Sequence, residues 1–338
     1  MLHRTLGLFD QDTRHRKLEA LGDPLVVLNK IVPWEMFREP LEATRNEGRD
    51  PKRGGRPAYD AVLMFKILVL REMYALSDEQ VEFQIADRMS FQRFLGIGIE
   101  HAVPDYTAVW RFRERLKGEA IAELFRTLGH YIDLAGFEAK KGQMLDASLV
   151  SKPRTRKPAQ PKDGEPELTV QQAAHRDADA NWTKKHGRSY FGYKNHVNAD
   201  VEHGFIREYA VTPASVHDSQ CIPELLATMQ KGQPLYGDSA YRSADTAERC
   251  KIFGMTDRTH YKANRNRPLT AQQEAWNTAR SKVRARVEHV FARIDLFRAG
   301  KPLRCTGLAR AKVCLGLINI AHNLRRLMTM HRFAMGMA

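Results

Sequence analysis

The chain has 338 residues, 43% of them hydrophobic, so it is long enough for about two folded domains and too apolar to be a disordered protein. It carries 54 Lys and Arg against 40 Asp and Glu, and the net charge of +14 favours a polyanionic partner such as nucleic acid. The sequence has no G-x-x-x-x-G-K-[ST] loop, which argues against nucleotide hydrolysis.

The beginning of the chain has no signal-peptide pattern, because it turns acidic within ten residues and lacks an apolar core. The most apolar run, 61–70, is too short to span a bilayer and contains Lys66, so we expect a buried helix there. These features predict a cytoplasmic protein without a membrane partner. The four cysteines form no C-x-x-C pair, which argues against a zinc ribbon or a disulfide framework.

An N-terminal extension, 1–50, precedes a basic Gly/Pro stretch and a series of short predicted helices. Pro57 stands at the start of the first and most apolar of these helices. Ser77 or Asp78 can cap the next helix, and Ser90 can cap a shorter one after a tight break.

A further helix opens at Pro104-Asp105 and aligns basic with aromatic side chains. Its residues include Trp110, Arg111, Phe112, Arg113 and Arg115. The series predicts an all-α, helix-turn-helix-like DNA-binding domain over 51–135, with Arg111 and Arg113 as DNA contacts. Any small helical bundle gives a similar pattern, so this alternative stays open.

From residue 140 the pattern changes to the alternation of β-strands. Strands are predicted over 142–150, 190–200, 205–214, 234–241 and 256–263. Helices are predicted over 218–230, 243–254, 270–299 and 308–328. Three successive strands, followed by strands that alternate with helices, predict an α/β domain over 140–330 with a mixed sheet flanked by helices.

A polar, Pro-rich insert, 151–189, separates the first two predicted strands and is basic at both ends. Such a segment is either a DNA-binding loop or plain disorder. On the first interpretation Lys152, Arg154 and Arg156 contact DNA.

Two aspartates occupy positions in this domain where a carboxylate is unusual. Asp146 lies inside an apolar predicted strand, where Asp is disfavoured, and shares a strand face with Ser148. Asp238 follows Gly237 at the carboxyl end of a short strand, where open α/β sheets bind their ligands. The alternatives are a solvated edge strand for Asp146 and a turn or capping role for Asp238.

Glu288 lies at the edge of the apolar stripe of the predicted helix 270–299. It stands four residues after Arg284, so an exposed helical ion pair is the alternative. Basic side chains surround it: Lys282, Arg284, Arg286, His289 and Arg293. They form either a solvated face or a surface that follows DNA phosphates beside a metal site.

Phosphodiester cleavage and joining use two divalent metal ions, which small sets of carboxylates bind. Two other groups of metal-ligand residues have simpler interpretations. Asp200, Glu202 and His203 fit a turn between strands, and Asp218 beside His217 fits a helix cap.

The order of Asp in a first strand, Asp at a later strand end and Glu on a basic helix resembles the DDE transposases of bacterial insertion sequences. The resemblance is greatest to the insertion-sequence-five group, within the insertion-sequence-four superfamily. The matching stretches are GQMLDASLV, KNHVNAD, TPASVHDSQ, LYGDSAYRS and SKVRARVEHVFARI. They cover residues 140–300, and 58–117 resembles the helical N-terminal domain of that group.

The resemblance implies a ribonuclease H-like fold in which Asp146, Asp238 and Glu288 bind two Mg²⁺, or Mn²⁺ in its place. It implies a DNA transposase that binds terminal inverted repeats, cuts there and joins the ends to target DNA, as a homodimer on DNA. In the Tyr-Arg-Glu-Lys signature of the family, Arg284 and Glu288 match. The Tyr position is Ser281, and the Lys position falls at or near Asp295, with Arg293 and Arg298 as stand-ins.

Three other functions stay open at this point. One is a nuclease that cuts without joining, and another is a DNA-binding descendant without catalytic activity, which only the altered Lys position favours. The third is a basic structural protein that binds DNA without preference for ends.

Overall fold

The computed structural model describes residues 10–48, 57–98, 100–153, 177–185, 187–227, 232–263 and 267–334. The chain divides into two compact units. Unit 1 comprises Met1–Leu116 and Leu327–Ala338, and unit 2 comprises Lys117–Arg326. No helix in the described ranges is long and apolar enough to cross a membrane.

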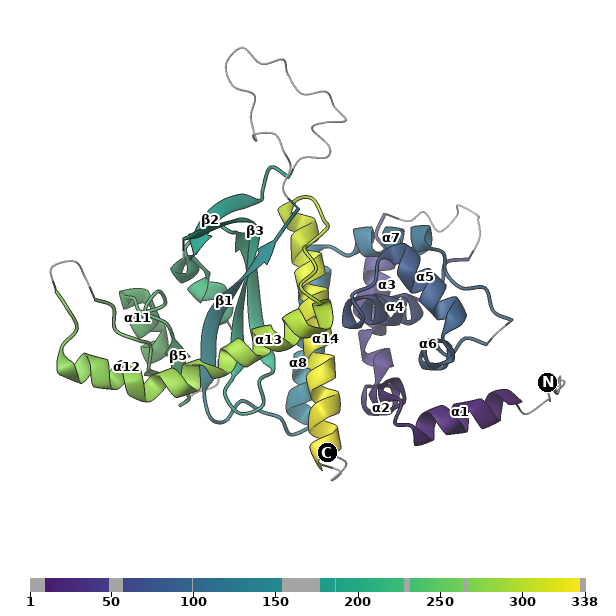
Figure 1. Ribbon diagram of the computed structural model, residues 1–338, viewed down its shortest axis with the longest axis horizontal. Coiled ribbons are helices and arrows are strands. Elements are labelled where there is room, and N and C mark those ends of the chain that lie inside the picture. The colour runs from purple at the N-terminus through teal and green to yellow at the C-terminus, as the bar shows by residue number, and fades with distance from the viewer. Residues whose placement is uncertain are drawn as a thin grey trace, which may run out of the picture. The chain divides into compact units, whose positions relative to one another are not determined.

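Unit 1 is built from short helices, as the sequence predicted (Figure 1). They are α1 (Asp10–Ala20), α2 (Pro24–Ile31), η1 (Trp34–Phe37), α3 (Arg38–Asn46), α4 (Ala61–Met73), α5 (Asp78–Asp87), α6 (Met89–Leu95) and α7 (Tyr106–Arg115). Helix α4 is buried along most of its length, including Lys66, which confirms the buried helix expected from the apolar run.

The helix starts of unit 1 follow side-chain capping. Ser77 accepts a hydrogen bond from the backbone N–H of Gln80, whose side chain accepts one in return from the N–H of Ser77. Asp105 caps α7 through the N–H of Ala108. The prediction that Ser90 caps α6 is wrong, because the extended backbone of Arg88 ends α5 and α6 begins directly after it.

Unit 2 contains a six-stranded mixed sheet. Its strands are β1 (Gln143–Ser151), β2 (Asn181–Lys185), β3 (Arg188–Asp200), β4 (Ile206–Pro213), β5 (Pro234–Gly237) and β6 (Thr256–Asp257). The order is β2-β3-β1-β5-β6, and β4 also pairs with β3. Strands β1 to β4 pair antiparallel, whereas β1, β5 and β6 run parallel.

This sheet confirms the expected fold class, a ribonuclease H-like mixed sheet flanked by helices after an all-α segment. The predicted strands are present, the last two shorter than expected. Strand β2 was missed and lies inside the predicted loop 151–189, because its side chains are mostly exposed and show no apolar alternation.

Helices pack against this sheet (Figure 1). They are α8 (Gly118–Leu134), η2 (Asp218–Cys221), α10 (Ile222–Leu225), α11 (Ala244–Ile252), α12 (Ala271–Arg284), α13 (Arg286–Arg298) and α14 (Leu308–Ala334). Helix α8 belongs to unit 2, whereas the sequence assigned it to the helical domain 51–135. The apolar face of α8 explains this grouping, since Phe125 packs on Tyr209 of β4 with ring centroids 4.8 Å apart.

The helix predicted over 270–299 is in fact two helices that meet at Ala285. Helix α12 buries none of its residues, whereas α13 buries Val287, Val290 and Ile294 of the predicted apolar stripe. Helix α13 packs against β1, and α12 packs against β1 and β5. The break therefore brings both helices over the part of the sheet that carries the predicted aspartates.

Candidate active site

Asp146 lies within β1 and Asp238 directly follows β5, so the two lie side by side where the parallel pairing of these strands ends. Strand β1 pairs with β5 so that Leu145 is opposite Gly237, and each aspartate is the next residue along the chain. Leu145 is fully buried in the core, so alternation turns Asp146 to the opposite face of the sheet. Carboxyl ends of parallel strands are where open α/β sheets bind ligands.

The Asp146 carboxylate is strongly affected by its surroundings. Burial is the larger cause and the charge of nearby Asp238 is a second one, and together they raise the pKa of Asp146 to about 6. The N–H of Ala147, which donates to Asp146 at 2.8 Å, and the cations of Arg284 and Lys185 act in the opposite direction. The nearby cations therefore do not offset the effects of burial and of the Asp238 charge on the Asp146 carboxylate.

A tight turn fixes Asp238. Its Oδ1 accepts a hydrogen bond from the N–H of Ala240 at 2.9 Å. A Cβ on Gly237 would lie 3.3 Å from the Cβ of Tyr241 and 3.4 Å from the Cγ2 of Thr259. Side chains of Tyr241 and Thr259 therefore leave little room for a residue larger than glycine before Asp238.

Arg284 connects the third acidic residue to this pair. Its Nη1 is 3.6 Å from Oδ2 of Asp146, and its Nη2 donates to Oε1 of Glu288 at 3.1 Å. The Glu288 side chain is 62% exposed, whereas that of Asp146 is 18% exposed. The helical ion pair considered for Glu288 is therefore present, but its arginine also reaches Asp146.

The chemistry of the three carboxylates fits a divalent metal ion only in part. Hard oxygen ligands suit Mg²⁺, and the cations of Arg284 and Lys185 do not offset the burial of Asp146 and the charge of Asp238. However, no group of three His, Cys, Asp or Glu side chains among the described residues is close enough to hold a metal ion. Glu288 would have to exchange its contact with Arg284 for one with the aspartates.

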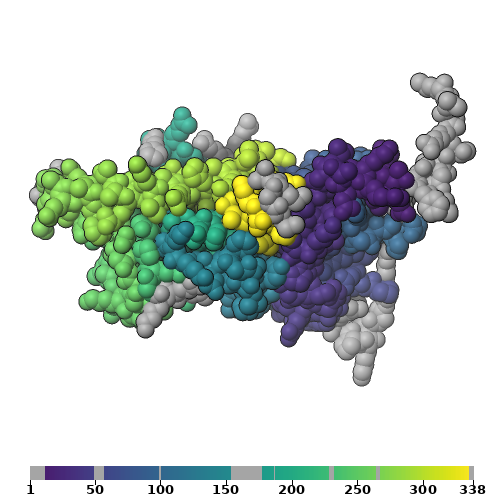
Figure 2. All heavy atoms as spheres, turned by 90° about the horizontal axis from the view of Figure 1, so that it is seen from below, coloured from purple at the N-terminus to yellow at the C-terminus, as the bar shows by residue number. Residues whose placement is uncertain are grey.

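The other basic residues of this region are placed differently. Helices α12 and α13 form a continuous light green surface in Figure 2, and Lys282 is exposed on it. Arg286 donates to the carbonyl of Val201 at 3.2 Å. The guanidinium of Arg293 lies beside Gly204.

The predicted DNA contacts at the ends of the insert fall into two groups. Lys152 is 7% exposed and forms an ion pair with Asp177 on the far side of the insert. Its ammonium also donates to the carbonyl of Cys305. Arg154 and Arg156 lie outside the described residues.

On α7 of unit 1 the predicted arginines also differ from one another. Arg111 is exposed, next to Trp110, which is exposed as well. Arg113 is only 12% exposed and pairs with Asp78 of α5 at 2.5 Å. Only Arg111 of the two predicted contacts is free to meet a phosphate in this structure.

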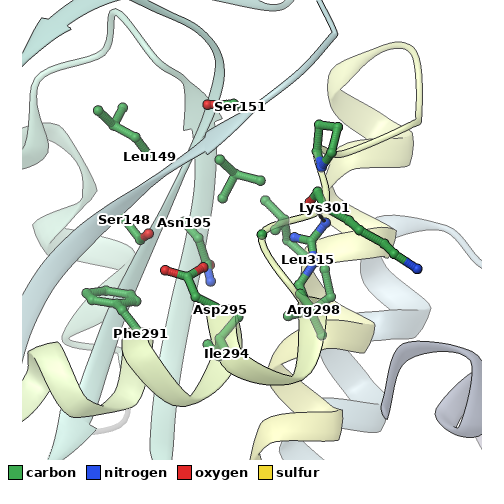
Figure 3. Close-up of a pocket in the computed structure, with 14 residues that line it drawn as sticks. Ser148, Leu149, Ser151, Asn195, Phe291, Ile294, Asp295, Arg298, Lys301 and Leu315 are labelled. Carbon is green, nitrogen blue, oxygen red and sulfur yellow. Dashed lines mark hydrogen bonds between the residues drawn. The ribbon is translucent and has the colours of Figure 1, made fainter. Parts of the chain in front are cut away.

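Asp295, at the Lys position of the family signature, lines a pocket of about 120 Å³ between α13 and β1. In Figure 3 its carboxylate lies beside Ser148 and Asn195, and Arg298 comes from the end of the same helix. Arg293 is not part of this pocket. Of the two stand-ins for the missing lysine, Arg298 shares the surroundings of Asp295.

The two other groups of metal-ligand residues have structural roles. Asp200 is fully buried, accepts hydrogen bonds from the N–H groups of His203, Gly204 and Phe205, and pairs with Arg207. Asp218 pairs with Lys194 at 2.8 Å.

His260 and Lys185 belong to the site and were not predicted. The N–H of His260 donates to the carbonyl of Gly237 at 3.1 Å. Burial and then the cation of Arg284 lower the pKa of His260. No sequence pattern marks either residue, because β6 and β2 bring them to the site through exposed or very short strands.

Comparison with known proteins gives two family matches. A model described as a transposase domain matches residues 13–115, and one described as a transposase DDE domain matches residues 139–324. The transposase for insertion sequence element IS1106 of Neisseria meningitidis serogroup B is 30% identical over 227 residues, which span 63% of this chain and 78% of that protein.

Two solved structures are also similar. One is a piggyBac transposase synaptic complex with hairpin DNA, with 12% identity, a TM-score of 0.49, and coverage of 96% of this chain and 78% of that one. The other is a pre-cleavage Mos1 transpososome, with 9% identity, a TM-score of 0.19, and coverage of 85% and 84%.

Proposed function

From the premise that the chain belongs to the transposases with a DDE domain, we propose that it cleaves DNA at the ends of an insertion sequence and joins them to a target. We assign it to the insertion-sequence-five group. The observation that carries the proposal is that Asp146 and Asp238 each follow the last parallel pair of β1 and β5, Leu145 and Gly237, with Arg284 linking Asp146 to Glu288.

In this proposal Asp146, Asp238 and Glu288 hold two divalent ions, Mg²⁺ or Mn²⁺. These ions supply charge stabilisation to the attacking and the leaving oxygen of the scissile phosphodiester. The raised pKa of Asp146, caused first by burial and then by the charge of Asp238, supports the assignment, since a bound cation stabilises the ionised carboxylate. Glu288 is exposed enough to turn toward them.

The guanidinium of Arg284 has a second task once Glu288 has turned. Its planar set of donors can bind two oxygens of one phosphate, and its present partners are the carboxylates of the site. We propose that it holds the scissile phosphate against Asp146 and Asp238. Lys282, Arg286 and Arg293 on the same helices continue the contact along the DNA backbone.

We propose that the terminal inverted repeats are bound through α7 with Arg111, and that the chain acts as a homodimer on DNA in the cytoplasm. Arg113 and Lys152, with their buried ion pairs, support the fold around these contacts. Arg154 and Arg156 remain proposed contacts. During joining, target DNA binds to the basic surface of α12 and α13 that carries Lys282, Arg286 and Arg293.

The test is a transposition assay in cells, with the native flanking DNA of the element as donor. Asp146→Asn and Asp238→Asn should each abolish joined products at expression matched to the parent. Cut but unjoined ends from the parent would instead identify a nuclease. End binding that is the same in the parent and in Asp238→Asn, without cutting in either, would identify an inactive descendant.

A further inference from the structure

Three arginines beside the carboxylate site are not explained by the proposed roles. Arg242 lies four residues after Asp238, Arg258 follows β6, and Arg280 lies one turn before Arg284 on α12. Within the described ranges of the chain, none of the three forms an ion pair with a carboxylate. They are half-buried, so each guanidinium has lost part of its hydration.

Aromatic rings hold two of these guanidiniums in place. The Cζ of Arg242 lies 3.6 Å from the ring centroid of Tyr261, and the Cζ of Arg280 lies 3.2 Å from that of Trp276. The two rings meet edge to face with centroids 5.9 Å apart. The result is a stack in the order Arg242, Tyr261, Trp276, Arg280.

The segment around Thr259 fastens this stack to the sheet. Its carbonyl accepts hydrogen bonds from Nη1 of Arg242 at 2.7 Å and from the indole N–H of Trp276 at 3.3 Å. The next residue, His260, is bonded through its N–H to the carbonyl of Gly237, directly before Asp238. Arg242 and Arg280 are therefore fixed relative to the aspartates, and little of their side-chain entropy remains to be lost on binding.

The arrangement costs free energy as long as no anion is present. Arg258 and Arg280 are close enough to repel each other, and burial and then this repulsion lower the pKa of Arg280. The Nε of Arg280 is buried without a hydrogen-bond partner. Buried charges without partners are rare in proteins unless a ligand supplies the opposite charge.

We propose that Arg242, Arg258 and Arg280 bind consecutive phosphates of the DNA strand that enters the carboxylate site. This inference rests on the proposed function and extends it to residues outside the family signature. Guanidinium groups match phosphate oxygens in geometry, and several of them along one path suit a repeating polyanion. The net charge of +14 agrees with such a partner.

The experiment measures the affinity of the full chain for a labelled duplex that carries the end of the element, over a series of salt concentrations. The parent is compared with Arg258→Gln/Arg280→Gln and with Arg258→Lys/Arg280→Lys. Lys312→Gln, which removes an exposed cation from α14, is the matched control.

The Gln pair should lower the salt slope by about 2, since each lost phosphate contact removes about 0.9, and should weaken binding at least about tenfold. The Lys pair should keep most of the slope, and Lys312→Gln all of it. A slope unchanged in the Gln pair overturns the inference. So does a Lys pair that behaves like the Gln pair and melts at lower temperature, because the arginines would then only tie α12 to the sheet.

Failure of the proposed function has a different signature. If the parent neither binds nor joins the element's end, the proposed function fails and the inference fails with it. If the parent joins ends and the Gln pair binds DNA with the parent's slope, only the inference fails.

Discussion

Arg284 is the residue on which the acidic groups of the site converge. Arg284 lies in the last turn of α12 and contacts Asp146 of β1. Across the break at Ala285 it also contacts Glu288, which lies in the first turn of α13. In the proposed mechanism a cation placed there compensates these acids before metal and phosphate bind. Arg284 would then give up Glu288, which makes the ion pair a resting contact of the proposed site.

Replacing Arg284 tests this role. Arg284→Gln should lower the rate of strand transfer about 100-fold, in the range found when one electrostatic contact to a transition state is removed. The melting temperature should change little, because exposed ion pairs contribute about 0–1 kcal/mol. Arg249→Gln, which breaks the exposed pair with Asp245 on α11, is the control. Equal joining rates in both variants would remove Arg284 from the mechanism.

His322 on α14 makes the stability of unit 2 sensitive to acid. It is 2% exposed, and its Nε2 contacts the carbonyl of Gly204 at 3.0 Å. Burial, followed by the charges of Arg293, Arg326 and Arg325, lowers its pKa to about 4. Between pH 6.5 and 4 the unfolded chain therefore binds more protons at this residue than the folded one.

The free energy of unfolding should accordingly fall as the pH drops from 6.5 to 4, by up to about 3 kcal/mol for a shift of this size. Urea unfolding followed by circular dichroism at several pH values measures this. His322→Gln should flatten the dependence, whereas His130→Gln, at an exposed position on α8, should not. Parallel curves for the parent and His322→Gln would contradict the assignment.

Single residues were predictable where they broke a local rule. Asp146 and Asp238 are polar groups at apolar strand positions, and the register now brings them together. The contact of Arg284 with Asp146 was not predictable, because it depends on how α12 packs on the sheet. The same limit applies to Lys152, because its partner Asp177 lies 25 residues further along the chain.

At the scale of elements, Gly192 joins three strands. It pairs with Ser151 of β1 and with Asn181 of β2. The next residue of β3, Tyr193, pairs with Pro213 of β4. The φ of Gly192, 152°, is rare for other residues, and a Cβ there would collide with the carbonyl oxygen of Val150. Strand β1, which carries Asp146, therefore depends on this glycine for its pairing with β3.

Gly192→Ala should destabilise the protein by about 2–4 kcal/mol, as expected for strain at a special backbone conformation. Gly129→Ala is the matched control, since Gly129 lies within α8 with open space around it. That change should stabilise by up to about 1 kcal/mol, because Ala favours a helix over Gly. The melting temperatures of both variants test this difference. Equal melting temperatures would show that the pairing of β3 does not require glycine at position 192.

Elements with strong periodicity were predictable and their interruptions were not. The strands β1, β3 and β4 follow from alternation, and α4 and α14 from long apolar runs. The break at Ala285 leaves no mark in the sequence, because Ala is the best helix former. It arises where the apolar stripe of α13 packs on the sheet while α12 buries none of its residues.

At the scale of the whole molecule, the positively charged side chains differ in whether they have an acidic partner. Cations such as Lys152, Arg113 and Arg207 are consumed in buried ion pairs inside their own units. In contrast, Lys282, Arg258 and Arg280 lack acidic partners within the described part of unit 2. These three cations, near Asp146 and Asp238, are therefore open to an anionic partner.

We propose that Asp238 belongs to a metal-dependent centre for joining DNA. The most direct measurement is the joining of a labelled element end to a plasmid by the purified chain in Mg²⁺, for the parent, Asp238→Asn and Asp245→Asn. Asp245 is exposed on α11 and serves as the matched control. We predict that the parent and Asp245→Asn join ends, and that Asp238→Asn falls by at least about 100-fold. Joining by Asp238→Asn at the rate of Asp245→Asn would contradict the account.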